Sequence, residues 1–184
     1  MVQTSPDIVH VIDYDPTWPQ SYQAERALLL SAIGSHITEL EHIGSTAIPG
    51  LAAKPVIDMM AALAEISQGA DLVAALSPLG YRLIETGMRE RLFLRKQLPD
   101  QAVSYHLHLV TAASWPTRNE RLLRDYLLTH PQAALAYGQL KQRLALEHPH
   151  DGAAYTRAKT DLIQAIMDLV RDERGLPHVS VWES

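Results

Sequence analysis

The sequence contains no cysteine, and this absence removes several kinds of chemistry at once. Without thiols the chain has no internal disulfide, no thiolate zinc site and no cysteine nucleophile. It also lacks an apolar run of about 18 residues, the length that spans a bilayer. The first residues, MVQTSPDIVHVIDYDP, have neither the basic start nor the apolar core of a signal peptide. We therefore expect a cytoplasmic protein with no membrane partner.

Positive charge is scarce as well. The 16 Lys and Arg residues are outnumbered by 21 Asp and Glu residues, which gives a formal net charge of -5. Proteins that coat nucleic acid or an anionic membrane need a positive field. The composition therefore carries no strong signal for a nucleic-acid partner and leaves room only for a local basic patch.

The size and the pattern of the chain suggest one domain with two differently built parts. Its 184 residues, 47% of them hydrophobic, suit a single globular domain with a substantial core. Strand-like and helix-like segments alternate over residues 1–116, whereas residues 117–175 follow helical periodicity. We predict an α/β (α+β) region followed by a C-terminal helical bundle, and a loose tail over residues 176–184.

Capping signals and periodicity predict the individual elements. Thr17 with Gln20, and Thr117 with Glu120, have the spacing of helix capping boxes, and Asp151 is placed to cap a further helix. The expected helices cover residues 17–33, 71–76, 117–130, the stretch before Pro149 that carries Leu135, Leu140 and Leu144, and 151–175. The expected strands cover residues 37–43, 55–63, 81–84, 89–96 and 104–110, with the last two paired antiparallel around Pro99-Asp100, and residues 8–12 form a strand or an extended arm.

Residues 41–60, EHIGSTAIPGLAAKPVIDMM, gather more polar chemistry and turn formers than any other stretch. Gly44-Ser45 follows a predicted strand, and a glycine there lets a phosphate approach the backbone N–H groups. Taken alone, Gly-Ser is more often an ordinary turn. Asp58 interrupts the next predicted strand and shares a face with Met60; a buried carboxylate is costly unless it is paired, hydrogen-bonded or metal-bound. A divalent cation held by Asp58 and by phosphate oxygens is one solution.

This arrangement resembles the nucleotidyltransferase superfamily typified by DNA polymerase β. The resemblance implies that Gly44 and Ser45 hold a triphosphate and that Asp58 is a catalytic magnesium ligand. The superfamily's second carboxylate falls two residues after the first, where this chain has Met60. Its third lies on a later strand, where residues 104–110 offer two histidines. Two-metal catalysis holds its cations about 3.5 to 4 Å apart with several oxygen ligands, and one aspartate does not supply them.

A longer resemblance covers about residues 9–170. Six segments of the chain are similar to the GrpB family: YDPTWPQSYQAE, EHIGSTAIPGLAAKPVIDM, HLHLV, RDYLLTHP, AYGQLK and YTRAK. The resemblance implies a nucleotidyltransferase-like mixed sheet flanked by helices, with the C-terminal helical region packed on it as part of one domain. It implies no defined activity, although members are sometimes fused to dephospho-coenzyme A kinase. The missing second carboxylate is then a trait of the family.

Further candidates lie around the motif. His106 and His108 alternate onto one face of their predicted strand, and with His42 they form a candidate cluster for a metal or a phosphate. Hydrogen-bonded histidines within a sheet are the alternative. Lys54, near the Gly-Ser turn, is a candidate phosphate ligand or an ordinary surface lysine. We expect Glu41 to brace the N–H groups of the turn, and a role as a ligand is the alternative.

A basic strip is predicted on the strand at residues 89–96. Arg89, Arg91, Phe93 and Arg95 share one face of it, which suits a nucleotide or a polyphosphate. The alternative is a solvated edge strand, on which arginines oppose aggregation.

Two Tyr-Lys pairs with four-residue spacing occur in the helical part, so each pair shares a helix face. The pairs are Tyr137 with Lys141 and Tyr155 with Lys159. They either line the same cleft as substrate-binding residues or serve in packing and surface pairing.

Three classes of function fit these residues. The first is an enzyme that transfers a nucleotidyl or phosphoryl group with Mg²⁺ at Asp58. The second is a noncatalytic module that binds a phosphate-containing small molecule and has lost the second metal site. The third is a metal-dependent hydrolase or lyase built on the histidines and Asp58. Fold alone does not choose among them, because function depends on the site.

Overall fold

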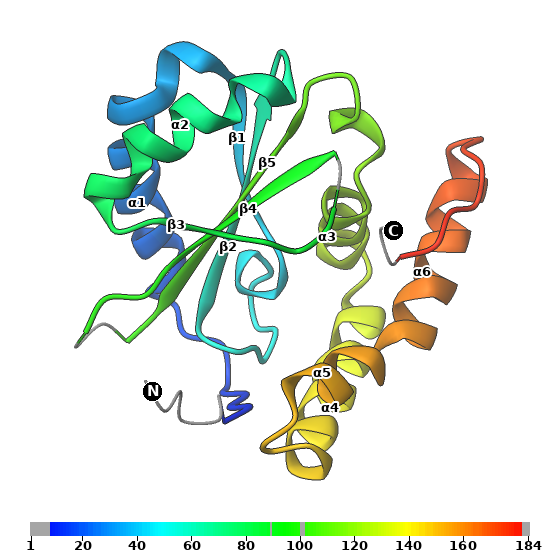
Figure 1. Ribbon diagram of the computed structural model, residues 1–184. Helices are drawn as coiled ribbons and strands as arrows, with labels where there is room; N and C mark the ends of the chain where they lie inside the picture. Colours follow the sequence, from blue (N-terminus) through cyan, green and yellow to red (C-terminus); the bar gives the residue numbers. More distant parts are fainter. Residues whose placement is uncertain (1–7, 89, 100–101, 182–184) are drawn as a thin grey trace.

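A five-stranded mixed sheet forms the centre of the molecule (Figure 1). The computed structural model describes residues 8–88, 90–99 and 102–181. The strands are β1 (Ile37–Ile43), β2 (Val56–Leu63), β3 (Arg82–Ile84), β4 (Arg91–Lys96) and β5 (Ser104–Thr111), in the spatial order β1-β2-β5-β4-β3. Only β2 and β5 are parallel neighbours. The mixed sheet and the antiparallel β4–β5 pair confirm the prediction, although Arg89 and Asp100 lie outside the described residues.

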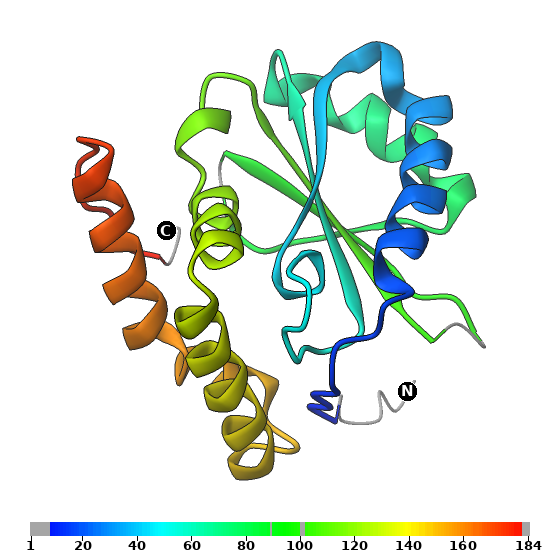
Figure 2. The same ribbon diagram turned by 180° about the vertical axis from the view of Figure 1, so that it is seen from behind.

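Helices α1 (Trp18–Ile33) and α2 (Gly69–Leu76) cover one face of the sheet (Figures 1 and 2). They supply apolar side chains that pack on the odd-numbered positions of β2 and β5. The cluster includes Leu29, Ile33, Ile57, Met59, Leu72, Leu76, Leu107 and Leu109, each at most 2% exposed. Burying one such side chain is worth about 1.5–3 kcal/mol, so this cluster is the main source of stability for the sheet.

The other face of the sheet looks toward the C-terminal helices (Figures 1 and 2). These are α3 (Asn119–Thr129), α4 (Pro131–Glu147), α5 (Gly152–Arg157) and α6 (Thr160–Glu173). They share a second core with the loop after β1, formed by Ile48, Leu51, Leu122, Leu127, Tyr137, Ile166, Met167 and Val170. No helix in the described ranges is both long and apolar enough to cross a membrane.

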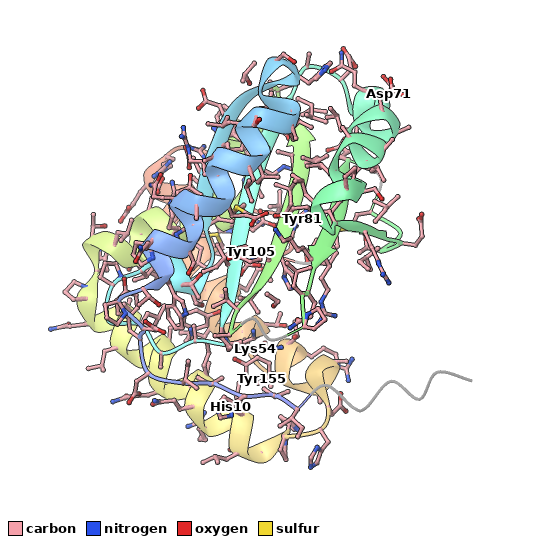
Figure 3. All side chains as sticks on the ribbon, turned by 90° about the vertical axis from the view of Figure 1, so that its left-hand side faces the viewer. His10, Lys54, Asp71, Tyr81, Tyr105 and Tyr155 are labelled. Carbon is pink, nitrogen blue, oxygen red and sulfur yellow. The ribbon has the colours of Figure 1, made fainter. Side chains whose placement is uncertain are left out.

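A buried polar cluster joins α1 to the sheet beneath the first core. Lys96 Nζ lies 2.9 and 2.8 Å from the two carboxylate oxygens of Glu25, and the Tyr81 hydroxyl donates to the same carboxylate at 3.0 Å. The Lys96 ammonium also lies over the rings of Tyr81 and Tyr105, both labelled in Figure 3. Since the cluster satisfies its own charges on the face away from the C-terminal helices, we assign it a structural role.

Two predicted capping boxes do not form, because the side chains involved make hydrogen bonds or ion pairs with other residues. Thr17 makes no side-chain cap on α1; instead its N–H and hydroxyl both donate to Asp15. Glu120 does not close a capping box with Thr117 but pairs with Arg91 of β4. The Asp151 cap is confirmed, since Asp151 accepts a hydrogen bond of 2.8 Å from Ala154 N.

The last predicted helix is divided in two, and three leucines of the helices face outward. The helix predicted over residues 151–175 is interrupted at Ala158–Lys159, which separates α5 from α6. Leu30, Leu135 and Leu169 are 37%, 63% and 56% exposed.

The tail is docked rather than loose as far as residue 181. Arg171 donates to the carbonyl of Pro177, and Gln164 exchanges hydrogen bonds with Val179 and Val181. Residues 182–184 lie outside the described part of the chain.

Candidate functional site

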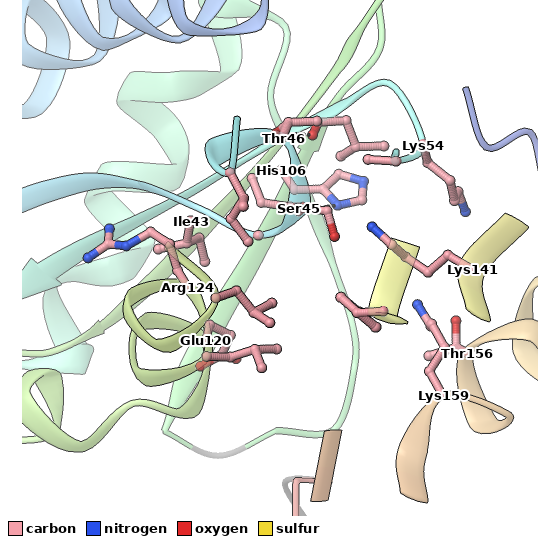
Figure 4. A pocket seen from close by; sticks show the side chains of 18 of the residues that line it. Ile43, Ser45, Thr46, Lys54, His106, Glu120, Arg124, Lys141, Thr156 and Lys159 are labelled. Atoms are coloured by element: carbon pink, nitrogen blue, oxygen red, sulfur yellow. Dashed lines mark hydrogen bonds and ion pairs between the residues drawn. The ribbon is translucent and has the colours of Figure 1, made fainter. Parts of the chain in front are cut away.

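A cavity of about 430 Å³ lies between the sheet and the C-terminal helices (Figure 4). It is walled by three parts of the chain: the turn after β1 with the loop that leads to β2, residues of β2 and β5, and helices α3 to α5 with Lys159 just after them. The polar and aromatic lining residues are Ser45, Thr46, Lys54, Asp58, His106, His108, Glu120, Arg124, Tyr137, Lys141, Tyr155, Thr156 and Lys159. Its volume lies within the usual range for small-molecule sites, about 300–1,000 Å³.

The turn after β1 brings Gly44 against the Asp58 carboxylate. Gly44 has a φ of 71°, and a Cβ atom there would lie 2.5 Å from Asp58 Oδ2. Register explains the contact, since Ile43, the residue before the turn, pairs with Asp58 across β1 and β2. Ser45 then begins a short 3-10 turn, η2 (Ser45–Ala47), at the cavity wall. Only glycine combines this backbone conformation with so close an approach.

Asp58 is held by a histidine on the neighbouring strand. The parallel register of β2 and β5 sets Asp58 beside His106, and His106 Nδ1 lies 3.1 Å from Asp58 Oδ1. Burial alone would raise the pKa of Asp58, but the hydrogen bond with His106 and the neighbouring histidines lower it below its ordinary value. Asp58 is therefore an ionised carboxylate, and His106 engages one of its two oxygens.

His108 lies deeper, two positions along β5. Its ring stacks on Phe93 with the ring centroids 4.9 Å apart, and its Nδ1 lies 3.1 Å from an Arg91 guanidinium nitrogen. Burial and the Arg91 charge lower the pKa of His108 to about 4, so the ring is neutral at pH 7. Arg91 in turn pairs with Glu120 of α3.

The opposite wall carries three lysines from three different elements. Lys141 comes from α4, Lys159 from the break between α5 and α6, and Lys54 from the loop before β2. Figure 4 shows all three side chains extending toward the space beside Ser45 and His106. The Tyr155 ring lies beneath two of the ammonium groups, 4.3 Å from Lys159 Nζ and 5.7 Å from Lys54 Nζ. Figure 3 shows Lys54 beside Tyr155 from another direction.

Lys141 is the most unusual of the three. It is only 2% exposed, and its Nζ has no hydrogen-bond partner among the described residues. The Tyr137 ring lies 4.6 Å from Lys141 Nζ. Burial and the nearby Lys159 charge lower the pKa of Lys141 to about 7, and burial and Lys54 lower that of Lys159 to about 8. An anion beside a buried amine of this kind stabilises its charged form.

Three residues predicted to bind substrate lie outside the cavity. His42 projects from the opposite face of β1, where its ring stacks on Tyr22 at 4.7 Å and its Nε2 lies 3.0 Å from Thr46 Oγ1. Arg91 is buried in its pairing with Glu120. Arg95 lines a separate hollow beside β3. The predicted histidine cluster is therefore reduced to His106 and His108. The basic strip on β4 shares their face of the sheet, since Phe93 pairs with His108 and Arg95 with His106, but its residues do not line the cavity.

The other predicted residues, Gly44, Ser45, Lys54, Asp58, His106, His108, Tyr155 and Lys159, all line the cavity. Tyr137 and Lys141 join them, as the first of the two Tyr-Lys pairs suggested. Glu41 does not brace the N–H groups of the turn as predicted; its carboxylate instead joins β1 to α3 by pairing with Arg121 and Arg124 at 2.9 and 2.6 Å. Sequence reasoning assigned Glu120 only to a capping box and did not single out Thr156, and neither carries a motif that points to the cavity.

The oxygen ligands of a magnesium pair are not assembled at Asp58. The position two residues on is Met60, which is fully buried in a small apolar cluster with Ile43 and Trp115. Among the described residues, no group of three or more His, Asp or Glu side chains is placed to hold a metal ion. The donor set therefore does not fit two bridged magnesium ions.

Comparison with known proteins gives consistent matches to one family. The family model for GrpB protein matches residues 8–169. A UPF0157 protein of Pseudomonas aeruginosa is 35% identical over 164 residues, which cover 88% of this chain and 67% of that protein. The crystal structure of the conserved protein GrpB from Enterococcus faecalis superposes with a TM-score of 0.81 at 30% identity, covering 90% of this chain and 99% of that one.

More distant likeness concerns the fold alone. Terminal uridylyl transferase 4 from Trypanosoma brucei, solved with bound UTP, superposes with a TM-score of 0.51 at 17% identity. The match covers 90% of this chain and 59% of that one. This chain therefore has a nucleotidyltransferase-like fold, as its sequence predicted.

Proposed function

The chain belongs to the GrpB family, and we propose that it binds a nucleotide or another phosphate-containing small molecule in the cavity between its sheet and its C-terminal helices. One observation carries the proposal: the Gly44-Ser45 turn and three lysines line the same cavity. Small glycine-containing turns and lysine ammonium groups are two common means of binding phosphate. The nucleotidyltransferase-like fold supports a nucleotide as the first ligand class to test.

We propose binding without nucleotidyl transfer as the primary role. Asp58 lies at the position where the fold's first metal ligand would lie, and Met60 replaces its expected partner with a buried apolar side chain. Transfer with one Mg²⁺ held by Asp58 and by ligand oxygens is the second candidate, because Asp58 faces the cavity directly beside Gly44. A hydrolase built on three histidines has less support, because His42 lies on the other face of β1.

A thermal-shift screen tests the proposal. Nucleoside mono-, di- and triphosphates, pyrophosphate and coenzyme A precursors are each added with and without Mg²⁺, Mn²⁺ or Zn²⁺. A ligand present at about 100 times its Kd stabilises the folded protein by about 2.7 kcal/mol, which gives a clear shift in Tm. We expect at least one phosphate compound to stabilise the wild type.

Two matched variants show whether the cavity is responsible. Ser45→Glu sets a carboxylate in the turn and should abolish the shift by repelling phosphate, whereas Ser35→Glu makes the same change at an exposed position and should not. The proposal is wrong if no phosphate compound stabilises the wild type, or if both variants respond as the wild type does. Asp58→Ala addresses the second candidate, since it should remove only a metal-dependent part of the shift.

A further inference from the structure

The lysine wall has a charge excess that no ion pair in the described protein neutralises, although Asp58 attracts Lys141 and Lys159 from across the cavity. Arg124, which also lines the cavity, pairs with Glu41 and Asp125, and Glu120 pairs with Arg91. Within the described ranges no carboxylate lies within ion-pair distance of Lys54, Lys141 or Lys159. The Tyr155 ring lies near Lys54 and Lys159, and the Tyr137 ring lies near Lys141.

Burial makes this excess costly in the free protein. A buried ammonium without a hydrogen-bond partner is among the least favourable arrangements in a protein interior. Packing alone would be served at position 141 by methionine or leucine, which fill a similar volume beside Tyr137 without a charge. The position instead carries a lysine whose Nζ points into the cavity, so the arrangement is best suited to a state in which an anion lies there.

The Asp58 side of the same cavity does not assemble a metal site that could bind phosphate in place of the lysines. One oxygen of Asp58 engages His106, and the other packs against Gly44. In two-metal sites the cations neutralise phosphate oxygens while several carboxylates hold the cations. Here Asp58 has no partner carboxylate at position 60, and three lysine side chains stand across the cavity.

We propose that Lys54, Lys141 and Lys159 bind the phosphate groups of the ligand directly and take the place of the paired magnesium ions. The inference rests on the proposed function, because it assigns the phosphate subsite of that same cavity. Three ammonium groups match a diphosphate or triphosphate better than a single phosphate, since each lysine is a separate point charge. The lowered pKa values of Lys141 and Lys159 agree with this geometry, because a bound anion would restore both charges. The ligand class is therefore a di- or triphosphate, free or attached to a nucleoside, bound without a divalent cation.

Isothermal titration calorimetry tests the inference, with pyrophosphate and ATP as probes. The full chain is titrated in metal-free buffer with EDTA and, separately, with Mg²⁺ at matched ionic strength. We expect binding in EDTA that Mg²⁺ strengthens by less than about threefold. Lys141→Met and Lys159→Met should each weaken binding about tenfold or more, because each removes a charge-assisted contact.

Two further variants make the result interpretable. Arg143→Met removes a positive charge from the exposed side of α4, two residues from Lys141, and should bind like the wild type. Lys141→Gln keeps a polar head in case the methionine variant fails to fold, and it should weaken binding similarly. Binding that requires Mg²⁺ and is lost in Asp58→Asn would overturn the lysine subsite while leaving the proposed function standing. Lysine variants that bind as tightly as the wild type would also overturn the lysine subsite. If neither probe binds in either buffer and the thermal-shift screen is also negative, the lysine subsite and the proposed function are both wrong.

Discussion

Gly44 is the position at which the cavity wall is most tightly specified. Its φ of 71° disfavours any side chain, and a Cβ atom would lie 2.5 Å from Asp58 Oδ2. Gly50, six residues on, has a φ of 78° but nothing within 4 Å of its ideal Cβ position. The two glycines therefore separate the cost of backbone strain from the cost of displacing Asp58.

Substitution of Gly44 by alanine should destabilise the protein more than substitution of Gly50. Both variants incur a left-handed backbone penalty of about 1 kcal/mol, and Gly44→Ala adds a clash with Asp58. We expect a difference of at least about 1 kcal/mol in the free energy of unfolding, measured by urea denaturation. Equal losses in the two variants would show that Asp58 does not lie against the turn.

Lys141 is predicted to lower the stability of the ligand-free protein. Lys141→Met should raise the free energy of unfolding by about 1–3 kcal/mol at pH 7, because it removes a buried ammonium that lacks a hydrogen-bond partner. Arg143→Met serves as the control, since its exposed side chain contributes little. A Lys141→Met protein less stable than the wild type would contradict an unpaired buried charge.

The extra stability of Lys141→Met over the wild type should depend on pH, in a direction fixed by the lowered pKa of Lys141. The pKa of Lys141 in the folded state is about 7, against an ordinary value near 10.5. Asp58 and Lys159 face position 141 in the wild type and in Lys141→Met alike. Below pH 7 both the folded and the unfolded states carry the proton, so the penalty is fully present. Between pH 7 and about 10 the folded state releases the proton, and the wild type gains stability relative to the variant. Thermal melts at pH 6, 7.5 and 9 should therefore show the variant's advantage shrinking as pH rises, and a constant advantage would be inconsistent with the shift.

Local sequence patterns predicted the helices and strands correctly where no residue from elsewhere in the chain competed for the same hydrogen bonds. Apolar alternation predicted β1 and β2 to within a residue, and helical periodicity predicted α1, α3 and α4. Capping boxes failed at Thr17 and Glu120 because Asp15 and Arg91 offered other hydrogen bonds. Arg91 is far from Glu120 in the sequence, so no local rule could anticipate that pairing.

Helix α1 is attached to the sheet by the Glu25–Lys96 pair as well as by apolar packing. Both side chains are buried, at 3% and 4% exposed, and Tyr81 completes the hydrogen bonds of the carboxylate. Glu25→Gln should lower the free energy of unfolding by about 3–5 kcal/mol, because Lys96 would be left as an uncompensated buried charge. Equilibrium urea denaturation measures the loss.

The double variant Glu25→Leu with Lys96→Met distinguishes the pair from the packing around it. It should recover most of the stability lost in Glu25→Gln, since apolar side chains of similar volume often replace a buried ion pair with little cost. A double variant as unstable as the single one would show that the geometry around Tyr81, and not the unpaired charge, controls the loss.

The candidate site combines residues that the sequence motif identified with residues that only the folded chain brings near. Gly44, Ser45 and Asp58 belong to one short stretch, so turn chemistry and an isolated carboxylate were enough to find them. His42 was assigned to the wrong face because the β1–β2 register was unknown; Ile43, and not His42, pairs with Asp58. Lys141 lies more than eighty residues from Asp58 in the sequence and shares a cavity with it only because the C-terminal helices fold over the sheet.

The architecture gives each part of the chain a separate task. The α1–α2 side of the sheet holds the larger apolar core and its own satisfied ion pair. The other side leaves a polar cavity whose two walls come from residues before and after position 117. Ligand binding would therefore join the sheet to the helical region through charge rather than through further apolar contact.

The most direct test is a crystal structure of the protein with the tightest-binding phosphate compound from the screen, grown in metal-free buffer. The account predicts phosphate oxygens within hydrogen-bond distance of Lys141 Nζ and next to the Gly44-Ser45 turn, with Lys54 and Lys159 closing on the same groups. Phosphate bound elsewhere, for example in the hollow between residues 49–52 and α4, with the lysine cavity holding only water, would contradict it.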